Sequence, residues 1–555
     1  MQTNNRPWLH KLQSLLYIVP SFYYIIGSYF RSILGDLSLR SLDPDYIYFI
    51  TGLGISEGHF KVSHVDNPGT PLQYLMGLTY RITHLFRPGS GTYLEDVFLN
   101  PDLYMSVSNL VITGLVTATL FYAGRRIYLA TGSVLYGILI QTTPFLAVIW
   151  YDLIGRIVPE LLMPLPIIFL EIFLIELIYS EKNVDEKKQI IMLSAISAIG
   201  LSIKLTFIPL WFIPIIIIRK WKDKILFFGL SILFFLLFAI PVTLRLSIFT
   251  GWIKSLFIHS GNYGAGEANF ISWNEFIPNL QFLWGYERWF LVTVILTLIT
   301  AIGYFFIHRK EADKKLLLVT GAVLVTVLLQ TGMVCKHFAH RYYIPSLLLF
   351  PILIFLITEF FKKTLKGKIK IIVPIGLIAF LLAFSVHQQP WIKMKTEAMS
   401  EDLDQRKETW HFVSTLEKNS IKIITTQNYG CPYKEYALMV SYTWAGDQQK
   451  YYTETLAKLY PDTYLYFTWN NAIKFWGNEL TLKRIKESKK PVYLYLENDT
   501  PELYQRTIKK FSFITDSLMV TPKLLFRNEK TKELVYKLNF GEADSTSNLS
   551  DITKK

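Results

Sequence analysis

Residues 225–244 read ILFFGLSILFFLLFAIPVTL, and residues 316–333 read LLLVTGAVLVTVLLQTGM. Neither run contains a charged side chain, and each is close to the ~20 apolar residues with which a helix crosses the core of a bilayer. The whole chain is biased in the same way, since 51% of its 555 residues are hydrophobic, 18% are charged and the mean hydropathy is +0.30. This hydrophobic excess is concentrated in runs of bilayer length, which predicts an α-helical, multi-span membrane protein.

Apolar runs of this kind predict about eleven transmembrane helices. The first run follows basic residues and shows no small-residue cleavage site at its end, so we interpret it as a retained signal anchor with a cytoplasmic N-terminus. The segment 71–86 is short and polar for a span, and we expect it to lie along the membrane interface. The expected spans are 14–34, 104–124, 133–150, 161–179, 189–203, 205–218, 225–247, 289–307, 316–333, 342–360 and 371–389.

Basic residues orient these spans, because positively charged short loops stay in the cytoplasm. Basic clusters flank both ends of the run 189–218, so we expect two crossings with Lys204 at the turn between them. With this choice the cytoplasmic segments hold 20 Lys and Arg in 54 residues, against 10 in 129 in the outer segments before the C-terminal region. The loops 35–103 and 248–288, and the chain after about residue 390, are therefore expected outside the cytoplasm. The net charge of +14 reflects this orientation, and it does not indicate a nucleic-acid surface.

The chain changes character after residue 389. Long apolar runs give way to short segments with the alternation typical of strands, separated by amphipathic segments typical of helices. No glycine-rich phosphate loop follows a strand, so nothing there indicates nucleotide binding. We predict a membrane domain over 1–389, a small extracytoplasmic α/β domain over 390–540 and a disordered tail over 541–555. The expected strands are 421–426, 463–468, 491–496 and 533–540, and the expected helices are 401–418, 479–488 and 500–510.

Two acidic residues open the first outer loop, which begins LDPDYIY at residues 42–48. Carboxylates at the membrane surface can act as a general base or hold a cation, and an aspartate before a helix is equally a good cap. The loop continues as HVDNPGT at residues 64–70, whose turn residues alone predict only a turn. Asp43 and Asp45 are the candidate catalytic residues of this loop.

The second outer loop reads YDLIGRIVPE at residues 151–160 and is followed directly by apolar residues. Glu160 at the head of a span needs a partner or water, and a structural ion pair with Arg156 explains it as well as a catalytic role does. Lys204 and Arg341 depart from the positive-inside pattern. Cations at the outer headgroup level suit a phosphate ligand, and they also suit ordinary lipid headgroups.

A third outer segment, HSGNYGAGE at residues 259–267, combines three glycines with polar groups. It is either a lid that orders over a substrate or a plain connecting loop, and it adds His259 and Glu267 to the candidates. The two cysteines, Cys335 and Cys431, exclude a disulfide framework and a four-thiolate metal site. Both are expected on the outer face, and we expect free thiols.

Together these motifs resemble those of the GT-C superfamily of polyprenyl-phosphate-sugar-dependent glycosyltransferases, especially bacterial relatives of protein O-mannosyltransferases and of the aminoarabinose transferase of lipid A. Residues 44–48, PDYIY, resemble the acid motif Pro-Asp-Glu-x-Tyr, with a tyrosine in the place of the glutamate and Asp43 as a substitute acid. Residues 67–69, NPG, resemble the motif His-Pro-Gly, with His64 as the stand-in for its histidine. The resemblance covers about residues 10–390.

Two later motifs extend the resemblance. The segment from Arg156 to Glu160 resembles the arginine and acid of the second outer loop, and RYYIP at residues 341–345 resembles a late Arg-Tyr-x-x-Pro motif. The resemblance implies an inverting transfer in which Asp45 deprotonates the acceptor hydroxyl, and that hydroxyl attacks the anomeric carbon. The leaving group is a polyprenyl phosphate, held by the cations Lys204 and Arg341.

The same resemblance implies the remaining partners and site residues. Asp43 and Glu160 add catalytic carboxylates or share a divalent cation with Asp45, although we expect no obligatory metal or other cofactor. The implied partners are a polyprenyl-phosphate-linked hexosyl or pentosyl donor, an unidentified hydroxyl acceptor (protein, lipid or glycan) and the bilayer of the inner (plasma) membrane. The expected substrate-binding residues are His64, Asn67, Arg156, His259, Glu267, His340 and Tyr342.

Two other functions remain open at this point. An O-antigen polymerase or ligase also uses lipid-linked sugars outside the cytoplasm, but the acids that open a long first outer loop and the terminal soluble domain argue against it. A transporter is favoured by repeats or by ionisable residues inside a span. No repeat is evident, whereas Glu171 and Glu176 do lie inside one expected span and keep this alternative open.

Overall fold

The chain folds into two compact units in the computed structural model. The first consists of Met1–Ser32, Ile55–Thr79 and Ser106–Thr396, and the second of Ile33–Gly54, Tyr80–Met105 and Glu397–Lys555. The residues that the structure describes are 13–542, apart from 41, 90, 181–185, 262, 263, 265, 267, 270, 368–370, 427–432, 468–471, 480–484, 486, 487 and 515–517.

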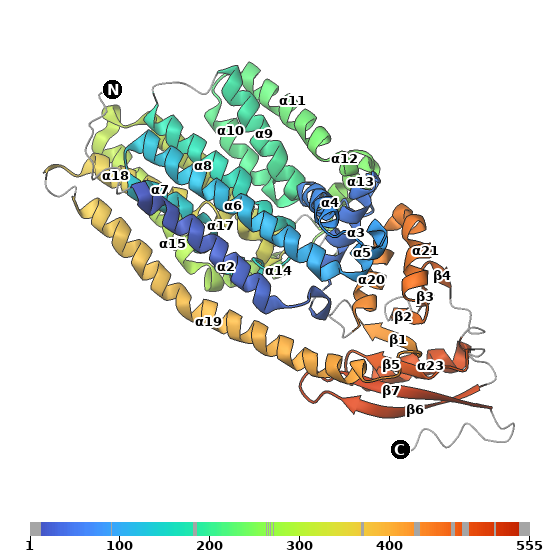
Figure 1. Cartoon of the computed structure of the whole chain (residues 1–555). Helices are drawn as coiled ribbons and strands as arrows, with labels where there is room; N and C mark the ends of the chain where they lie inside the picture. Colours follow the sequence, from blue (N-terminus) through green and yellow to red (C-terminus); the bar gives the residue numbers. More distant parts are fainter. Residues whose placement is uncertain are drawn as a thin grey trace. The chain divides into compact units, whose positions relative to one another are not determined.

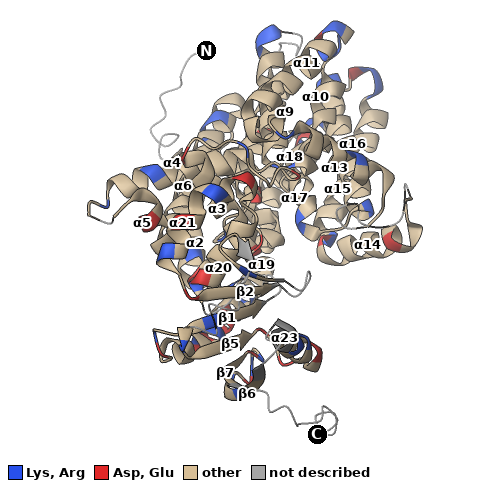
Figure 2. Cartoon of the chain, turned by 90° about the vertical axis from the view of Figure 1, so that its right-hand side faces the viewer, with Lys and Arg blue, Asp and Glu red and all other residues tan. Residues whose placement is uncertain are grey.

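The chain is a multi-pass membrane protein. Among the described residues, six helical segments are long and apolar enough to cross a membrane, and each coincides with an expected span. Figure 2 shows Lys and Arg in blue at the ends of several helices, with long stretches free of charge between them. The six segments are α6 (Pro101–Thr131), η5 with α8 (Pro159–Leu162, Pro164–Tyr179), α15 with η8 (Arg288–His308, Arg309–Glu311), α16 (Lys314–Lys336), η9 with α17 and α18 (His340–Tyr343, Ile344–Leu347, Phe350–Thr364) and α19 (Ile372–Ser414).

The other expected spans are built from shorter helices. The expected span 133–150 is not a continuous helix, because α7 (Val134–Gln141) gives way to two 3-10 turns around Pro144. Proline lacks an N–H and clashes with the preceding turn, so an α-helix ends before it. The count of eleven spans therefore stays a prediction. The shorter elements are η1 (Ser14–Tyr17), α2 (Ile18–Leu34), η3 (Thr143–Leu146), η4 (Val148–Asp152), α9 (Lys187–Ile203), η6 (Leu205–Trp211), α10 (Phe212–Ile217) and α11 (Trp221–Phe238).

The chain reverses direction at Lys204, as expected. Helix α9 ends at Ile203, the backbone of Lys204 is extended (φ −161°, ψ 140°), and η6 follows. The indole N–H of Trp211 donates to the carbonyl oxygen of Ser197 over 3.1 Å, which ties the returning segment back onto α9. Lys204 thus occupies the tip of a hairpin.

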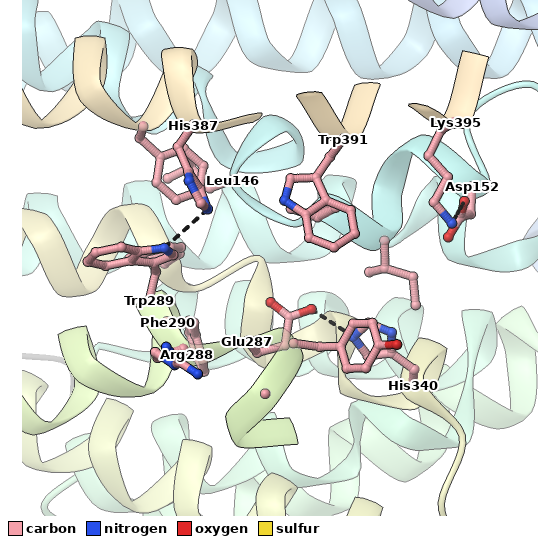
Figure 3. Close-up of a pocket in the computed structure, with 16 residues that line it drawn as sticks. Leu146, Asp152, Glu287, Arg288, Trp289, Phe290, His340, His387, Trp391 and Lys395 are labelled. Carbon is pink, nitrogen blue, oxygen red and sulfur yellow. Dashed lines mark hydrogen bonds and ion pairs between the residues drawn. The ribbon is translucent and has the colours of Figure 1, made fainter. Parts of the chain in front are cut away.

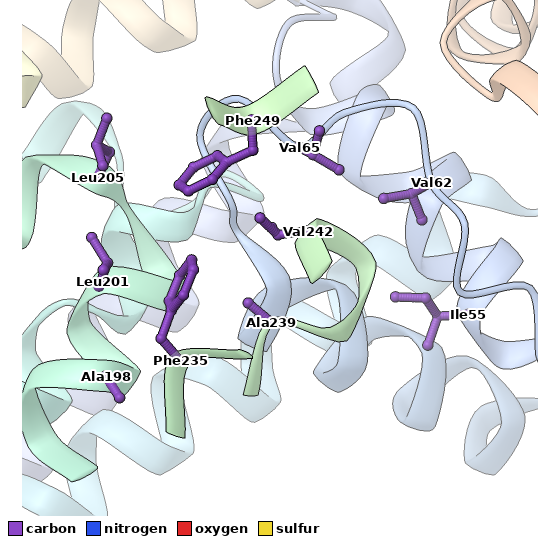
Figure 4. Packing of buried hydrophobic residues seen from close by; sticks show 10 residues of the cluster. All are labelled: Ile55, Val62, Val65, Ala198, Leu201, Leu205, Phe235, Ala239, Val242 and Phe249. Atoms are coloured by element: carbon purple, nitrogen blue, oxygen red, sulfur yellow. The ribbon is translucent and has the colours of Figure 1, made fainter. Parts of the chain in front are cut away.

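A hydrophobic cluster packs the first outer loop against this hairpin in the first unit (Figure 4). The loop after α3 (Asp45–Ser56) contributes Val62 and Val65, and helices α9 and α11 contribute from the other side. Where these side chains belong to membrane-spanning helices, they are held together by van der Waals packing rather than by removal from water. The complete cluster is Ile55, Val62, Val65, Ala198, Leu201, Leu205, Phe235, Ala239, Val242 and Phe249, with the last two from α12 (Ile240–Thr243) and α13 (Leu246–Ile258).

The second unit contains a seven-stranded sheet of order β4-β3-β2-β1-β5-β7-β6. Its centre is parallel, because β1 pairs in parallel with β2 and β5, and the outer pairs are antiparallel. The four expected strands are confirmed as β1 (Ile421–Thr426), β2 (Thr463–Phe467), β5 (Val492–Leu496) and β7 (Leu534–Glu542). Strands β3 (Ala472–Phe475), β4 (Asn478–Glu479) and β6 (Leu518–Arg527) were not expected, nor were helices α20 (Lys434–Thr443) and α21 (Gln449–Leu459).

Helix α19 differs from the expectation of two separate helices. It runs unbroken for 43 residues with Pro390 inside it (Figure 1). A proline removes only one intrahelical hydrogen bond, and the charged residues that follow are good helix formers, so the helix continues. The expected helix 401–418 is therefore the end of α19, and the expected helix 500–510 is confirmed as α23 (Pro501–Ile514). Most of the expected helix 479–488 lies outside the described residues.

The second unit also recruits two segments of the first outer loop, which the expected boundary at residue 389 did not include. Arg40 pairs with Asp402 over 2.6 Å, and Lys458 pairs with Glu95 over 2.7 Å. The hydroxyl of Tyr460 donates to the carbonyl oxygen of Phe98 at 3.0 Å in helix α5 (Tyr93–Leu99). At the C-terminus, β7 takes in the first two residues of the expected tail, and residues 543–555 lie outside the described part.

Candidate functional site

The centre of the candidate site is a buried ion pair between Glu160 and Lys204 in the first unit. Glu160 lies in the 3-10 turn η5 at the head of α8, and Lys204 lies at the hairpin tip. The ammonium group of Lys204 pairs with Oε1 of Glu160, and the two residues are only 4% and 1% exposed. A buried charge is tolerated when an opposite charge and hydrogen bonds compensate it, so each residue stabilises the ionised form of the other.

A second cation, Arg341, approaches the same carboxylate. Its Nε lies 4.0 Å from Oε1 of Glu160, and its side chain is 31% exposed. The ammonium group of Lys204 also lies 4.8 Å from the centroid of the Tyr342 ring, a cation–π geometry. Arg341 and Tyr342 both lie in the 3-10 turn η9. This turn is held to α16, because Gln330 donates to the carbonyl oxygen of Tyr342 over 2.8 Å.

The Asn-Pro-Gly motif lies beside this cluster. The N–H of Gly69 donates to the carbonyl oxygen of Ile203 over 3.0 Å, which fixes the motif to the residue that precedes Lys204. Asn67 and Tyr342 share the lining of a small cavity of about 50 Å³. Its other lining residues, mostly apolar, are Leu205, Thr206, Trp252, Leu256, Met333, Val334 and His337.

His337, which sequence analysis did not select, connects two outer segments. Its ring nitrogens Nδ1 and Nε2 each lie 2.8 Å from a backbone carbonyl oxygen, that of Gly261 and that of Leu256. The end of α13 is therefore attached to the end of α16 beside the small cavity. A histidine that follows a span at its outer end was the only sequence signal for this role.

The remaining candidates of the first unit make the following contacts. His64 Nδ1 lies 3.1 Å from Oδ1 of Asp66, and the carbonyl oxygen of Arg156 accepts from Asn109 over 2.8 Å. His259 Nδ1 lies 3.1 Å from the carbonyl oxygen of Gly266, a contact within its own loop. His340 pairs with Glu287 and lines a larger cavity. Glu267 lies outside the described residues.

Asp43 and Asp45 belong to the second unit. Asp45 is the first residue of α3 and is fully buried, whereas Asp43 is exposed before Pro44. Next to Asp45 in the sequence, burial raises the pKa of the Tyr46 phenol, so this hydroxyl stays protonated. The structure therefore provides one buried and one exposed carboxylate in the acid motif.

A buried carboxylate of the same unit escaped sequence analysis. Asp96, fully buried, accepts from Nε of Arg87 over 3.0 Å and from Asn100 over 2.9 Å. It also contacts His84 Nδ1 at 3.0 Å and the hydroxyl of Tyr104. So many partners satisfy the carboxylate internally, which indicates a structural role.

The described residues provide no evidence for a metal site or for a reactive cysteine. In the described ranges no three His, Cys, Asp or Glu side chains form a group that could hold a metal ion, and the expectation of no obligatory metal stays a prediction. Cys335 is a buried free thiol, and Cys431 lies outside the described residues.

The chain is similar to two solved structures of ArnT from Cupriavidus metallidurans. The TM-score is 0.48 for the structure bound to undecaprenyl phosphate and 0.49 for the apo state. For each, the sequence identity is 10%, and the match covers 96% of this chain and 98% of the other. No protein-family model matches the chain, and no curated protein matches it at a significant level.

Proposed function

We propose that this protein is an integral-membrane glycosyltransferase. It moves a hexosyl or pentosyl group from a polyprenyl-phosphate-linked donor to a hydroxyl acceptor on the extracytoplasmic face, with inversion at the anomeric carbon. The observation that carries this proposal is the convergence of Lys204 and Arg341 on the single carboxylate of Glu160. Two cations and one carboxylate leave a net charge of +1, which suits a phosphate ester.

The cluster suits a phosphate that leaves with its negative charge. The acceptor oxygen forms a bond to the anomeric carbon, while the bond from that carbon to the phosphate oxygen breaks and leaves its electron pair on the phosphate. Lys204 and Arg341 stabilise this charge with preorganised donors. The leaving phosphate needs no strong general acid, and the proton of the acceptor hydroxyl passes to a carboxylate base, for which Asp45 is the predicted residue.

Lys204 and Arg341 have distinct roles in this scheme. Lys204 is nearly buried and held by Glu160, so its ammonium group costs little reorganisation when the phosphate binds. Arg341 is more exposed, and a guanidinium has the planar geometry that can donate to two phosphate oxygens. Loss of Arg341 should therefore affect donor binding most directly.

Donor and acceptor saturation curves of the purified full chain in nanodiscs test the proposal, with a polyprenyl-phosphate sugar as donor. Arg341→Ala and Lys204→Ala should raise the donor KM at least tenfold while the acceptor KM stays within twofold. Arg341→Lys should restore the donor KM only in part, because lysine lacks the planar guanidinium that can donate to two oxygens. Lys254→Ala, which removes an exposed cation of α13, is the matched control and should leave both constants unchanged.

Unchanged donor curves for both variants would contradict the proposal and favour general lipid contacts. The polymerase, ligase and transporter alternatives would then return. The two acids that kept a transporter open have partners on other elements, since Glu176 pairs with Arg126 and Glu171 accepts from the hydroxyl of Thr143 over 3.0 Å. Undecaprenyl phosphate, the ligand of one similar ArnT structure, is the lipid we propose to use in competition experiments.

A further inference from the structure

The first unit contains a second, larger cavity of about 370 Å³, separate from the small cavity beside Lys204. Figure 3 shows side chains from two sides of it. His387, Trp391 and Lys395 follow one another at helical spacing on α19 and form one wall. The opposite wall is formed by Glu287 and Trp289 at the start of α15 and by His340. The volume falls within the range of ~300–1,000 Å³ that is typical of ligand sites.

Three pairs of side chains hold these walls in place. Nε2 of His340 lies 2.7 Å from Oε1 of the buried Glu287, and the ammonium group of Lys395 lies 2.7 Å from Asp152. The indole N–H of Trp289 donates to Nε2 of His387 over 3.1 Å. These contacts preorganise the cavity, so that a ligand need not order its walls on binding.

Two groups at the cavity remain available to a ligand. Within the described part of the chain, the guanidinium of Arg288 and the indole N–H of Trp391 have no hydrogen-bond partner, and both side chains are exposed. The carboxylate of Glu287 keeps its second oxygen, Oε2, to accept from a hydroxyl. The cavity therefore offers a cation, a donor, an acceptor and flat aromatic faces.

The surface beside the cavity is apolar. Leu382 and Val386 on α19 are each 63% exposed, and only 11% of the apolar window of that helix is buried. Exposed side chains of this kind face lipid in a membrane protein, and tryptophans are typical of the interface where the headgroups lie. A ligand of this cavity can therefore hold a polar group inside it and place a hydrocarbon chain along α19.

The cavity and the candidate donor site share the turn η9. His340 lines the cavity, while the next residue, Arg341, approaches Glu160. One short turn thus carries a residue of each site, which places the ligand of the cavity next to a donor phosphate held by Lys204 and Arg341. An acceptor must occupy such a neighbouring position for its hydroxyl to attack.

We propose that this cavity binds the acceptor, and that the acceptor is a membrane lipid whose headgroup carries hydroxyl groups and a negative charge. The identification as acceptor rests on the proposed function. Arg288 binds the negative charge, Glu287 accepts from a hydroxyl, and Trp391 packs against the headgroup. We favour a lipid over a protein because the exposed apolar surface of α19 beside the cavity can accommodate the hydrocarbon chain of a lipid.

Photo-crosslinking of the full chain in its native membrane tests the binding site without requiring transfer. Trp391→p-benzoylphenylalanine places the probe in the cavity, and Leu382→p-benzoylphenylalanine is the matched control on the lipid-facing side of the same helix. After irradiation, mass spectrometry should show anionic, hydroxyl-bearing lipids at least fivefold enriched at position 391 over position 382. Equal lipid composition at both positions, or a crosslinked protein at 391 alone, would overturn the proposal.

Kinetics then test the assignment as acceptor site. Trp391→Ala and Glu287→Gln should raise the KM for the lipid acceptor at least tenfold and leave the donor KM within twofold, the reverse of the pattern expected for Arg341→Ala. An acceptor KM within twofold of wild type for both variants would overturn the assignment. Selective labelling at position 391 with no transfer by the wild-type chain would refute the glycosyltransferase function and the acceptor role, and would leave a headgroup-selective lipid site.

Discussion

Lys204 and Glu160 lie 44 positions apart in the chain and form a nearly fully buried ion pair, with the ammonium group of one against the carboxylate of the other. Each residue stands where the chain departs from regular α-helix, Lys204 at a hairpin tip and Glu160 in a 3-10 turn. The ion pair thereby connects two irregular segments from different parts of the first unit. The pair thus links two parts of the fold and also forms the core of the candidate phosphate site.

Removal of one member of this pair should destabilise the protein. Glu160→Gln leaves the ammonium group of Lys204 buried without its carboxylate, which costs about 3–5 kcal/mol in comparable buried pairs. The double variant Glu160→Gln with Lys204→Met should recover at least half of that loss. Thermal unfolding in detergent measures both effects, and strictly additive losses in the double variant would show that the two residues are not coupled.

Asp45→Asn should abolish transfer while the protein stays folded and inserted in the membrane. Loss of a general base typically lowers the rate by roughly 10²–10⁴-fold. Transfer assays at saturating donor and acceptor measure the change, and Asp43→Asn at the exposed neighbouring position provides the comparison. If Asp45→Asn keeps activity within about threefold of wild type, the role passes to Asp43 or Glu160, or no general base is needed.

The C-terminal region should lie outside the cytoplasm. This expectation rests on the 20 basic residues of the cytoplasmic segments against 10 in the longer outer segments, and on the interfacial placement of α4 (Thr70–Leu85). A reporter fused after Lys555 should report an extracytoplasmic position, and a reporter at the N-terminus a cytoplasmic one. A cytoplasmic signal from both fusions would mean an even number of spans.

Acid should remove the contribution of the Glu95–Lys458 pair to the stability of the second unit. Hydrogen bonds from Lys458 and Thr92 lower the pKa of Glu95 from 4.5 to about 2. A carboxylate with a lowered pKa stabilises the folded state above about pH 4.5, and this stabilisation is lost as the pH falls toward about 2. The difference in melting temperature between wild type and Glu95→Gln should therefore shrink over this interval.

Lys434→Ala is the control for this pH dependence, since it removes another lysine that contacts the same helix, at the carbonyl oxygen of Leu99. Its effect on the melting temperature should not depend on pH between 2 and 4.5. A Glu95→Gln difference that is constant over the same interval would show that Glu95 is not paired in solution.

Local patterns in the sequence predicted much of the secondary structure, although helices α20 and α21 were not predicted. Runs of apolar residues predicted the six long spans, and basic clusters on both sides of 189–218 predicted the reversal at Lys204. Alternating patterns predicted four of the seven strands. Strand β6, which was not predicted, contains Pro522, and a proline is tolerated at the edge of a sheet, where β6 lies.

Which charged side chains meet depends on the tertiary structure. In the sequence Glu160 stands four positions from Arg156, which suggests an ion pair between these two residues. In the structure Glu160 pairs with Lys204 instead, and Arg341 lies near the same carboxylate. The i, i+4 rule for ion pairs holds on an α-helix, and Glu160 lies in a 3-10 turn. The way the membrane-spanning helices pack decides which distant cation reaches a buried carboxylate. Apolar runs of similar composition do not predict which helices become neighbours.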